Sequence, residues 1–429
     1  MPKKLDSKTH KIASKVAWMI VFLALTAFIY YDGMGVQDKS GVSDTEKKKK
    51  IYSRLLISEK EGVFHKSGLL GWCKINGRRY FQAAPERFTQ NKVNCQDYTV
   101  YMSQSGVQVL IYYVLYSLTG DFTLLEIFPA LLLSLALVMY LRWVNRRHGG
   151  FPTIISFLGI LFLRYLILMG DNLAIVVGAN LLVFVGILWA IESSTKHLFL
   201  VTGALMLFKY LLTGAEFIVS IIFTAYLPII FYGVIRDWIL WDYLVKIFHV
   251  SLGVIIASII SLSILFIQLS GSDLPKTGPE HFISKLDART LCLLSDNGLT
   301  RNPCIHKNRE ALSKTLKDYL SKDTVKTDRF SIKSYQLTII YGVFGLFALY
   351  HLKYRQLNPG LVGLLLLTSA SILSPISYII LMHGHSSLWG HKTWSPLIWD
   401  APFNLLGILL VSVTVKVYVE DILKVEYKL

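Results

Sequence analysis

Charged and histidine side chains stand at the ends of long apolar segments of this sequence. A carboxylate held near the boundary of hydrocarbon has a raised proton affinity, which suits a general base that takes a proton from a hydroxyl group. Arginine and lysine at the same boundary can bind phosphate, and the guanidinium group is the better fork for it. Each residue alone could be a solvated helix end, but their convergence predicts a functional site. The candidates are the carboxylates Asp32, Asp171 and Glu216, the cations Arg54, Arg164 and Lys392, and the histidines His383, His385 and His391.

Asp32, directly after the first apolar segment, is the first candidate for the base, and Asp171 is the second. Glu216 could orient an acceptor or stabilise a cation. The histidines follow an HxHxxxxxH pattern in a segment that glycine and proline interrupt, and the first pair lacks the i, i+4 spacing of a helix. The pattern therefore favours hydrogen bonds to phosphate or sugar over metal ligation, and a position at the membrane interface without a ligand is the other alternative. No cofactor is expected, and a divalent metal is left as an alternative.

The composition requires a bilayer as the solvent. The 429 residues are 53% hydrophobic and only 17% charged, and the mean hydropathy is +0.48. Continuous apolar runs such as LLLSLALVMYL exclude the alternating pattern of barrel strands. The fold class that follows is an all-α, polytopic transmembrane helical bundle of about ten spans.

The basic balance does not indicate a nucleic-acid partner. The formal net charge is +16, but the basic residues are dispersed over tails and loops rather than gathered on one aromatic-rich module. An anionic membrane surface or a phosphate-bearing lipid explains the charge better. The sequence has no P-loop, no GxGxxG, no nucleophile elbow and no HExxH, so a transferase would use a lipid-carried donor rather than a nucleotide.

The apolar segments divide the chain into five parts. The lysine-rich start predicts a cytoplasmic N-terminus and an uncleaved first span. The last tail is also expected in the cytoplasm, and the protein in the inner (plasma) membrane. The parts are 1–31 with the first span, 32–104 as an external loop, 105–269 as the transmembrane core, 270–333 as a second external loop, and 334–429 as the last spans with an external loop at 383–402.

The four cysteines fall as two pairs, and each pair lies inside one polar loop. The natural interpretation is two disulfides in an oxidising compartment, Cys73 with Cys95 and Cys292 with Cys304. Free or metal-binding thiols are the alternative, although no CxxC spacing occurs.

Both loops should then face the same side of the membrane. Segments 105–119 and 124–143, counted as two spans, place Asp121 inside and Arg146 outside. The counts of membrane crossings from the two loops agree only if residues 151–170 form a re-entrant or interfacial segment, with Arg142, Arg146 and Arg147 outside. This arrangement conflicts with the rule that basic residues stay in the cytoplasm.

Several short motifs together resemble the integral-membrane glycosyltransferases of the GT-C superfamily. They are the acidic residue after the first span, YSRLL at 52–56, YMSQSGVQ before the second span, the Arg164 to Asp171 element, FKYLLTGAEF at 208–217 and SPISYIILMHGHS at 374–386. The size and the two large external loops resemble, more narrowly, the bacterial serotype-converting O-antigen glucosyltransferases.

This resemblance implies an undecaprenyl-phosphate sugar as donor, a surface glycan of the lipopolysaccharide type as acceptor, and Asp32 as catalytic base on the periplasmic face. It adds Gln104 to the donor-binding residues, and it implies a re-entrant region. Asp32 stands alone rather than in an acidic doublet, so the expected mechanism is metal-free. The acceptor is expected to displace the lipid phosphate in one step, with inversion.

Other functions remain open. An O-antigen polymerase or ligase would have a similar topology. A flippase or transporter for a lipid-linked glycan would show inverted repeats and charges at the membrane midplane, which the sequence does not show. A non-catalytic scaffold would leave the one-sided cluster of charges unexplained.

Overall fold

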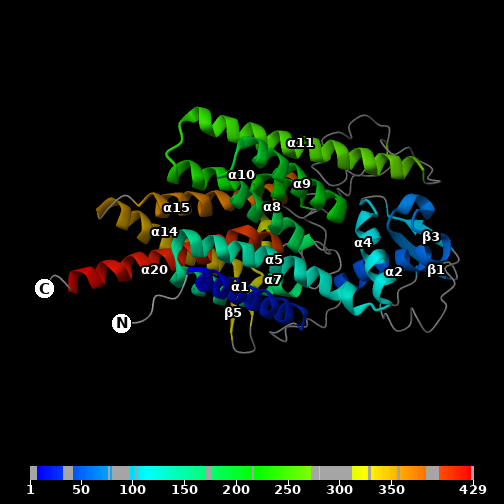
Figure 1. The fold of residues 1–429 in the computed structure, drawn as a ribbon, viewed down its shortest axis with the longest axis horizontal. Helices are drawn as coiled ribbons and strands as arrows, with labels where there is room; N and C mark the ends of the chain where they lie inside the picture. The colour runs from blue at the N-terminus through cyan, green and yellow to red at the C-terminus, as the bar shows by residue number, and fades with distance from the viewer. Residues whose placement is uncertain are drawn as a thin grey trace.

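A computed structural model describes residues 7–31, 42–75, 78–79, 97–101, 104–170, 176–214, 217–271, 280, 312–326, 330–354, 358–382 and 396–426. Within these ranges, eight helices are long and apolar enough to cross a bilayer. They run roughly side by side along the long axis of the molecule (Figure 1). The predicted all-α polytopic bundle is therefore confirmed, and the chain is a multi-pass membrane protein.

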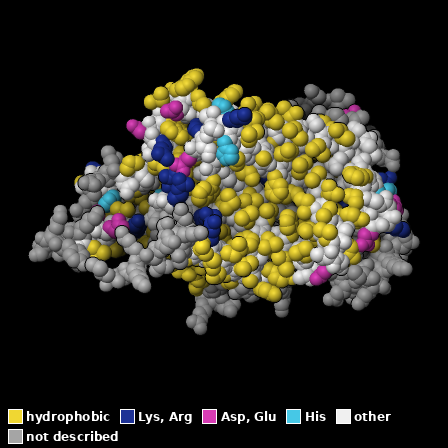
Figure 2. All heavy atoms as spheres, viewed as in Figure 1, with side chains coloured by type: hydrophobic (Ala, Val, Ile, Leu, Met, Phe, Trp, Pro, Cys, Tyr) yellow, Lys and Arg dark blue, Asp and Glu magenta, His cyan; other side chains and the backbone are white. Residues whose placement is uncertain are grey.

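The spanning helices carry apolar faces that remain exposed in the isolated chain, as expected for contact with lipid. Figure 2 shows this surface as a broad hydrophobic belt with charged side chains at its two ends. The eight spans are formed by α1 (Ser7–Tyr30), α5 (Thr123–His148), α9 (Thr195–Thr213), α10 (Ile218–Ile235), α11 (Leu240–Ser270), α14 (Ser334–Tyr354), α15 with α16 (Pro359–Ser371 and Leu373–Leu381), and η4 with α20 (Trp399–Asn404 and Leu405–Glu426).

Shorter apolar helices complete the bundle. They are α4 (Val107–Thr119), α6 (Gly150–Leu161), α7 (Arg164–Leu168) and α8 (Val176–Ala190). With 15 residues, α8 is roughly 22 Å long, less than the roughly 30 Å of a hydrocarbon core. Almost every α8 side chain is buried, which is typical of a helix that is apolar all round. The short helices α6, α7 and α8 therefore begin or end inside the bundle rather than at its surface.

The first loop carries a small folded unit at one end of the bundle. It consists of α2 (Val42–Glu61), η1 (His65–Gly68) and an antiparallel sheet in the order β2-β1-β3, with strands at Arg78–Arg79, Gly71–Ile75 and Asp97–Val100. Helix α4 stands across the ends of the spanning helices beside this unit (Figure 1). Tyr52 of α2 packs edge-on against Phe122, directly before α5, at 5.6 Å between ring centroids. We call this end of the bundle the loop end.

The second loop contributes α13 (Leu312–Leu320) and the antiparallel strands β4 (Asp323–Lys326) and β5 (Ser331–Lys333). Hydroxyl groups of Thr324 and Ser334 lie 2.6 Å apart and join β4 to the start of α14.

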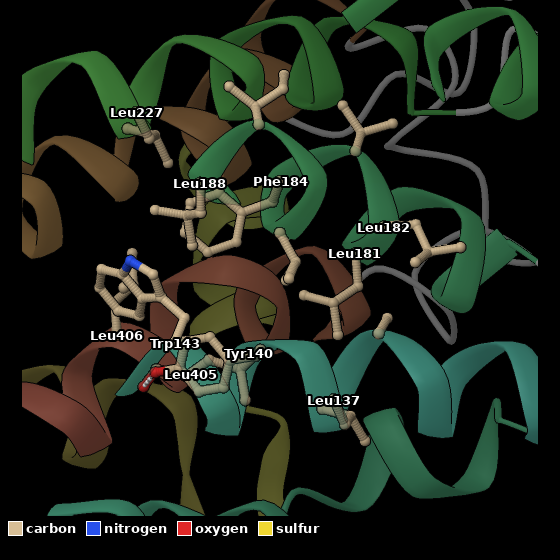
Figure 3. Packing of buried hydrophobic residues seen from close by; sticks show 14 of the residues in the cluster. Leu137, Tyr140, Trp143, Leu181, Leu182, Phe184, Leu188, Leu227, Leu405 and Leu406 are labelled. Atoms are coloured by element: carbon tan, nitrogen blue, oxygen red, sulfur yellow. Dashed lines mark hydrogen bonds between the residues drawn. The ribbon is translucent and has the colours of Figure 1, made fainter. Parts of the chain in front are cut away.

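The core lies between α5, α8, α10 and α20. Figure 3 shows Tyr140 and Trp143 of α5 together with Leu405 and Leu406 of α20. The Tyr140 hydroxyl donates to the Leu405 carbonyl at 2.9 Å, and the Trp143 indole N–H donates to the Tyr232 hydroxyl at 3.1 Å. These bonds satisfy the polar tips of side chains that are otherwise surrounded by apolar groups.

The predicted position of Arg142, Arg146 and Arg147 on the side of the two loops is wrong. Arg146 and Arg147 form ion pairs with Glu192, which follows α8, and Glu192 also pairs with Arg236, which follows α10. The C-terminal ends of α5, α8 and α10 therefore meet at the end opposite the loop end. We call it the arginine end.

The error arose because residues 105–119 were counted as a span. Helix α4 has only 13 residues and lies across the loop end, so Asp121 is on the side of α2 rather than inside. Segment 150–190 then begins beside Arg147 and ends beside Glu192. The whole of α6, α7 and α8, and not residues 151–170 alone, enters and leaves at the arginine end.

Candidate functional site

The outer end of α1 meets the end of the short helix α7 inside the bundle. A Cβ atom placed on Gly170, two residues after α7, would clash with the side chains of Ile29 and Leu133. Ile29 is almost fully buried there. Only a glycine lets the α7 backbone approach α1 this closely. The contact joins two segments that are 141 residues apart in the sequence (170 minus 29).

The start of α7 is held by Asp400, which the sequence analysis did not single out. One carboxylate oxygen of Asp400 accepts the Leu166 backbone N–H at 3.1 Å, and the other accepts the Asn404 side-chain amide at 2.8 Å. Asp400 is completely buried. The N-cap residue of α7, Leu163, offers no side-chain acceptor, so Asp400, 234 residues from Leu166, satisfies a first-turn N–H in its place. The available signal was an acidic residue at the edge of an apolar span.

A cluster of buried side chains, which we call the outer cluster, surrounds Asp400 and its neighbours in η4. Its members are Val176, Phe217, Tyr319, Val325, Leu337, Tyr341, Tyr378, Ile379, Met382, Ile398, Trp399 and Phe403. Phe217 and Tyr378 have ring centroids 5.0 Å apart. The cluster therefore gathers the ends of α8, α10, α16 and η4 with the second-loop elements α13 and β4.

Most of the predicted site residues lie outside the described residues. They are Asp32, Asp171, Glu216, His383, His385, His391 and Lys392. Their neighbours in the sequence are nevertheless informative. Asp32 follows α1 three residues after Ile29, and Asp171 directly follows Gly170, so the two carboxylates are attached to segments that touch. Glu216 directly precedes Phe217, and His383 directly follows Met382. Phe217 and Met382 belong to the outer cluster.

Two cations lie close in sequence to these candidates, one on α7 and one on α9. Arg164 is the first residue of α7, half-buried, with its guanidinium carbon 5.6 Å from the centroid of the Tyr165 ring. Lys209 on α9 is completely buried, and its ammonium group donates to the Gly214 carbonyl at 2.9 Å. Lys209 was inside the quoted FKYLLTGAEF motif but was not chosen. Its position four residues before the end of a helix that leads to Glu216 makes it a further candidate.

Gln104 has a structural position. Its amide donates to the Gln108 side chain at 2.9 Å and to the Leu212 carbonyl at 2.5 Å. The hydroxyl of Ser105 donates to the Leu211 carbonyl at 2.9 Å. These bonds satisfy carbonyls at the C-terminal end of α9 and fix α4 across it.

Arg54 is also engaged by the protein itself. Its guanidinium donates to the carbonyls of His65, at 2.7 Å, and Val63, and lies over the Tyr98 ring. Burial lowers the pKa of Arg54 from its usual value, while Tyr98 partly offsets this shift. The arginine thus fastens the turn after α2 to β3, and its position does not favour a role in phosphate binding.

Cys73 lies on β1, is buried, and does not carry a free thiol. Cys95, Cys292 and Cys304 lie outside the described residues, so both predicted pairings stay predictions. Within the described part of the chain, no three His, Cys, Asp or Glu side chains are grouped as a metal site would require. The histidines at 383–391 are outside this search.

The fold and the placement of its apolar helices define the class of protein, a multi-pass α-helical membrane protein with breaks in several of its helices. No protein-family model, curated protein or solved structure matches the chain.

Proposed function

We propose that the chain is an integral-membrane glycosyltransferase that moves a sugar from a polyprenyl-phosphate donor to a surface glycan. The contact between Ile29 and Gly170 carries this proposal, because it joins the segments that lead into Asp32 and Asp171. Arg164 on α7 belongs to the same element as Gly170 and supplies a cation. Carboxylate and guanidinium groups are what a hydroxyl acceptor and a phosphate leaving group require.

The breaks in the helices support a site at this depth. Non-helical backbone is tolerated at membrane depth only where protein or a water-filled cavity satisfies its polar groups. Here α7 is separated from α6 by the extended residue Leu163, and Ala401 interrupts η4 with non-helical angles. Discontinuous helices of this kind often border binding sites in membrane proteins. A lipid-linked donor suits such a position, because its tail stays in the bilayer and its phosphate stays at the boundary.

In the proposed reaction, the carboxylate of Asp32 takes the proton of the acceptor hydroxyl. The acceptor oxygen forms a bond to the anomeric carbon from the side opposite the leaving group, and the bond from that carbon to the phosphate oxygen breaks. The polyprenyl phosphate leaves as an anion whose charge Arg164 and Lys392 balance, so no acid is needed for the leaving group. Inversion at the anomeric carbon follows from this single displacement.

The distribution of basic residues indicates which end of the bundle faces the cytoplasm in this proposal. Arg146, Arg147 and Arg236 lie at the arginine end, and Lys353 closes α14, which runs away from the second loop. Because short cytoplasmic segments carry excess Lys and Arg, the arginine end faces the cytoplasm and the loop end faces the periplasm. Both termini are then cytoplasmic, the protein lies in the inner membrane, and sugar transfer occurs on the periplasmic face.

The test compares the surface glycans, by mass spectrometry, of cells with and without the gene. We expect an added monosaccharide only in cells that have it. A changed glycan chain length would instead indicate a polymerase, and loss of all surface glycan would indicate a transporter, so either result would contradict the proposal.

A further inference from the structure

The arginine end holds a charge network that the proposed transfer reaction does not use. The Glu192 carboxylate accepts hydrogen bonds from Arg147 and from Arg236, the latter at 2.6 Å, and Arg146 lies 3.7 Å from it. One carboxylate thus faces three guanidinium groups, which leaves two positive charges uncompensated in this network.

The network divides into a buried part and an open part. Arg147 is the more enclosed arginine, and it also donates to the Tyr232 hydroxyl at 3.3 Å. The side chains of Arg146 and Arg236 are 58% and 56% exposed. Arg147 therefore fixes Glu192 and the ends of α5, α8 and α10, while Arg146 and Arg236 offer donors to the outside.

Glu192 remains a carboxylate in this setting. Burial raises its pKa, but hydrogen bonds from Arg147 and Arg236 outweigh that effect and hold the pKa below its usual value. The network thus keeps its arrangement of one negative and three positive groups across the ordinary range of pH.

Apolar and indole groups border the open arginines. The guanidinium of Arg146 lies over the Trp189 ring at 5.8 Å. Directly after Arg236 and Asp237, the turn into α11 exposes Ile239, Leu240 and Trp241. Figure 2 shows basic side chains gathered around an acidic one at the edge of the hydrophobic belt. Exposed apolar side chains and indoles beside cations are typical of the level of lipid headgroups.

We propose that Arg146 and Arg236 form a binding site for the phosphate of an anionic phospholipid, whose acyl chains lie against the exposed turn between α10 and α11. The guanidinium fork matches phosphate oxygens, and the uncompensated charge favours an anionic headgroup over a zwitterionic one. Asp242, near the turn, does not remove this preference, since its carboxylate accepts the Ile239 N–H at the start of α11 and attracts Lys246. The site is independent of the proposed transfer reaction.

The test measures phosphatidylglycerol and phosphatidylcholine retained by the purified full chain in native mass spectrometry. We expect the wild type to prefer phosphatidylglycerol, and Arg146→Gln/Arg236→Gln to weaken its binding roughly 30-fold, at about fivefold per basic group. The matched control, Lys314→Gln/Lys317→Gln, removes two exposed charges from α13 and should bind as the wild type does.

A second variant should change the binding of phosphatidylglycerol in the opposite direction. Glu192→Gln removes the carboxylate that competes with phosphate, so phosphatidylglycerol should bind more tightly. A network with only a structural role would leave lipid binding the same in both variants. Unchanged retention in Arg146→Gln/Arg236→Gln, or weaker retention in Glu192→Gln, would overturn the proposal.

Discussion

Replacing Asp32 with asparagine is expected to reduce sugar transfer roughly 10²- to 10⁴-fold, the usual effect of removing a general base. The amide keeps the size of the side chain but cannot take the proton of the acceptor hydroxyl. The measurement is the release of polyprenyl phosphate from a lipid-linked sugar by the purified protein in vesicles, with the acceptor glycan present. Binding of the donor should change little, because the phosphate is held by cations rather than by Asp32.

Asp38→Asn is the matched control, since it removes the same charge from the same loop six residues later. It should retain full activity. Equal activities of Asp32→Asn and the wild type would remove Asp32 from the mechanism, and equal losses in both variants would indicate a general effect of loop charge.

Replacing Asp400 with leucine is expected to destabilise the protein and to abolish transfer. The Leu166 N–H and the Asn404 amide would lose their acceptor inside the bundle, which costs roughly 2–6 kcal/mol at about 1–3 kcal/mol for each donor. The measurement is the temperature above which the detergent-solubilised protein no longer elutes as a single monodisperse peak. Transfer should be lost even below that temperature, because α7 is no longer held.

The exposed aspartate Asp121 provides the comparison. It also accepts a backbone N–H at the start of a helix, from Thr123 at 2.9 Å, but in contact with water. Asp121→Ala should cost only about 1 kcal/mol, as for an ordinary N-cap. Asp400→Asn keeps one acceptor and should fall between the two. A leucine variant as stable as Asp121→Ala would show that α7 does not depend on Asp400.

The sequence predicted the helical class and most spans because long apolar runs such as those of α5 and α11 have one stable solution in a bilayer. It failed at α4, whose composition resembles a span. A 13-residue apolar helix is roughly 20 Å long, and hydropathy does not reveal whether it crosses the membrane or lies over the helix ends. The bonds from Gln104 and Ser105 to the end of α9 decide the matter, and they are contacts of tertiary structure.

The site was less accessible to sequence reasoning for the same reason. Asp400 bonds to a backbone N–H 234 residues away, and no local pattern records that partner. Arg54 was predicted to bind the donor phosphate, but its guanidinium donates to backbone carbonyls of the turn at 63–65. Charge at a segment end shows that a residue needs a partner. The fold determines whether the partner is a ligand or the protein's own backbone.

The central claim is that the outer end of α1 meets α7, which brings together the segments that lead into the two candidate carboxylates. The most direct measurement is cross-linking of Ile29→Cys/Gly170→Cys under oxidation, detected by peptide mapping without reduction. A disulfide needs Cβ atoms about 3.5–4.5 Å apart. Ile29→Cys removes the methyl group that a Cβ atom at position 170 would meet, so the double variant can place both Cβ atoms in this contact and is expected to form the bond. Ile29→Cys/Gly342→Cys, with position 342 in open space on α14, should not cross-link. No bond between positions 29 and 170, or equal cross-linking of both pairs, would contradict the account.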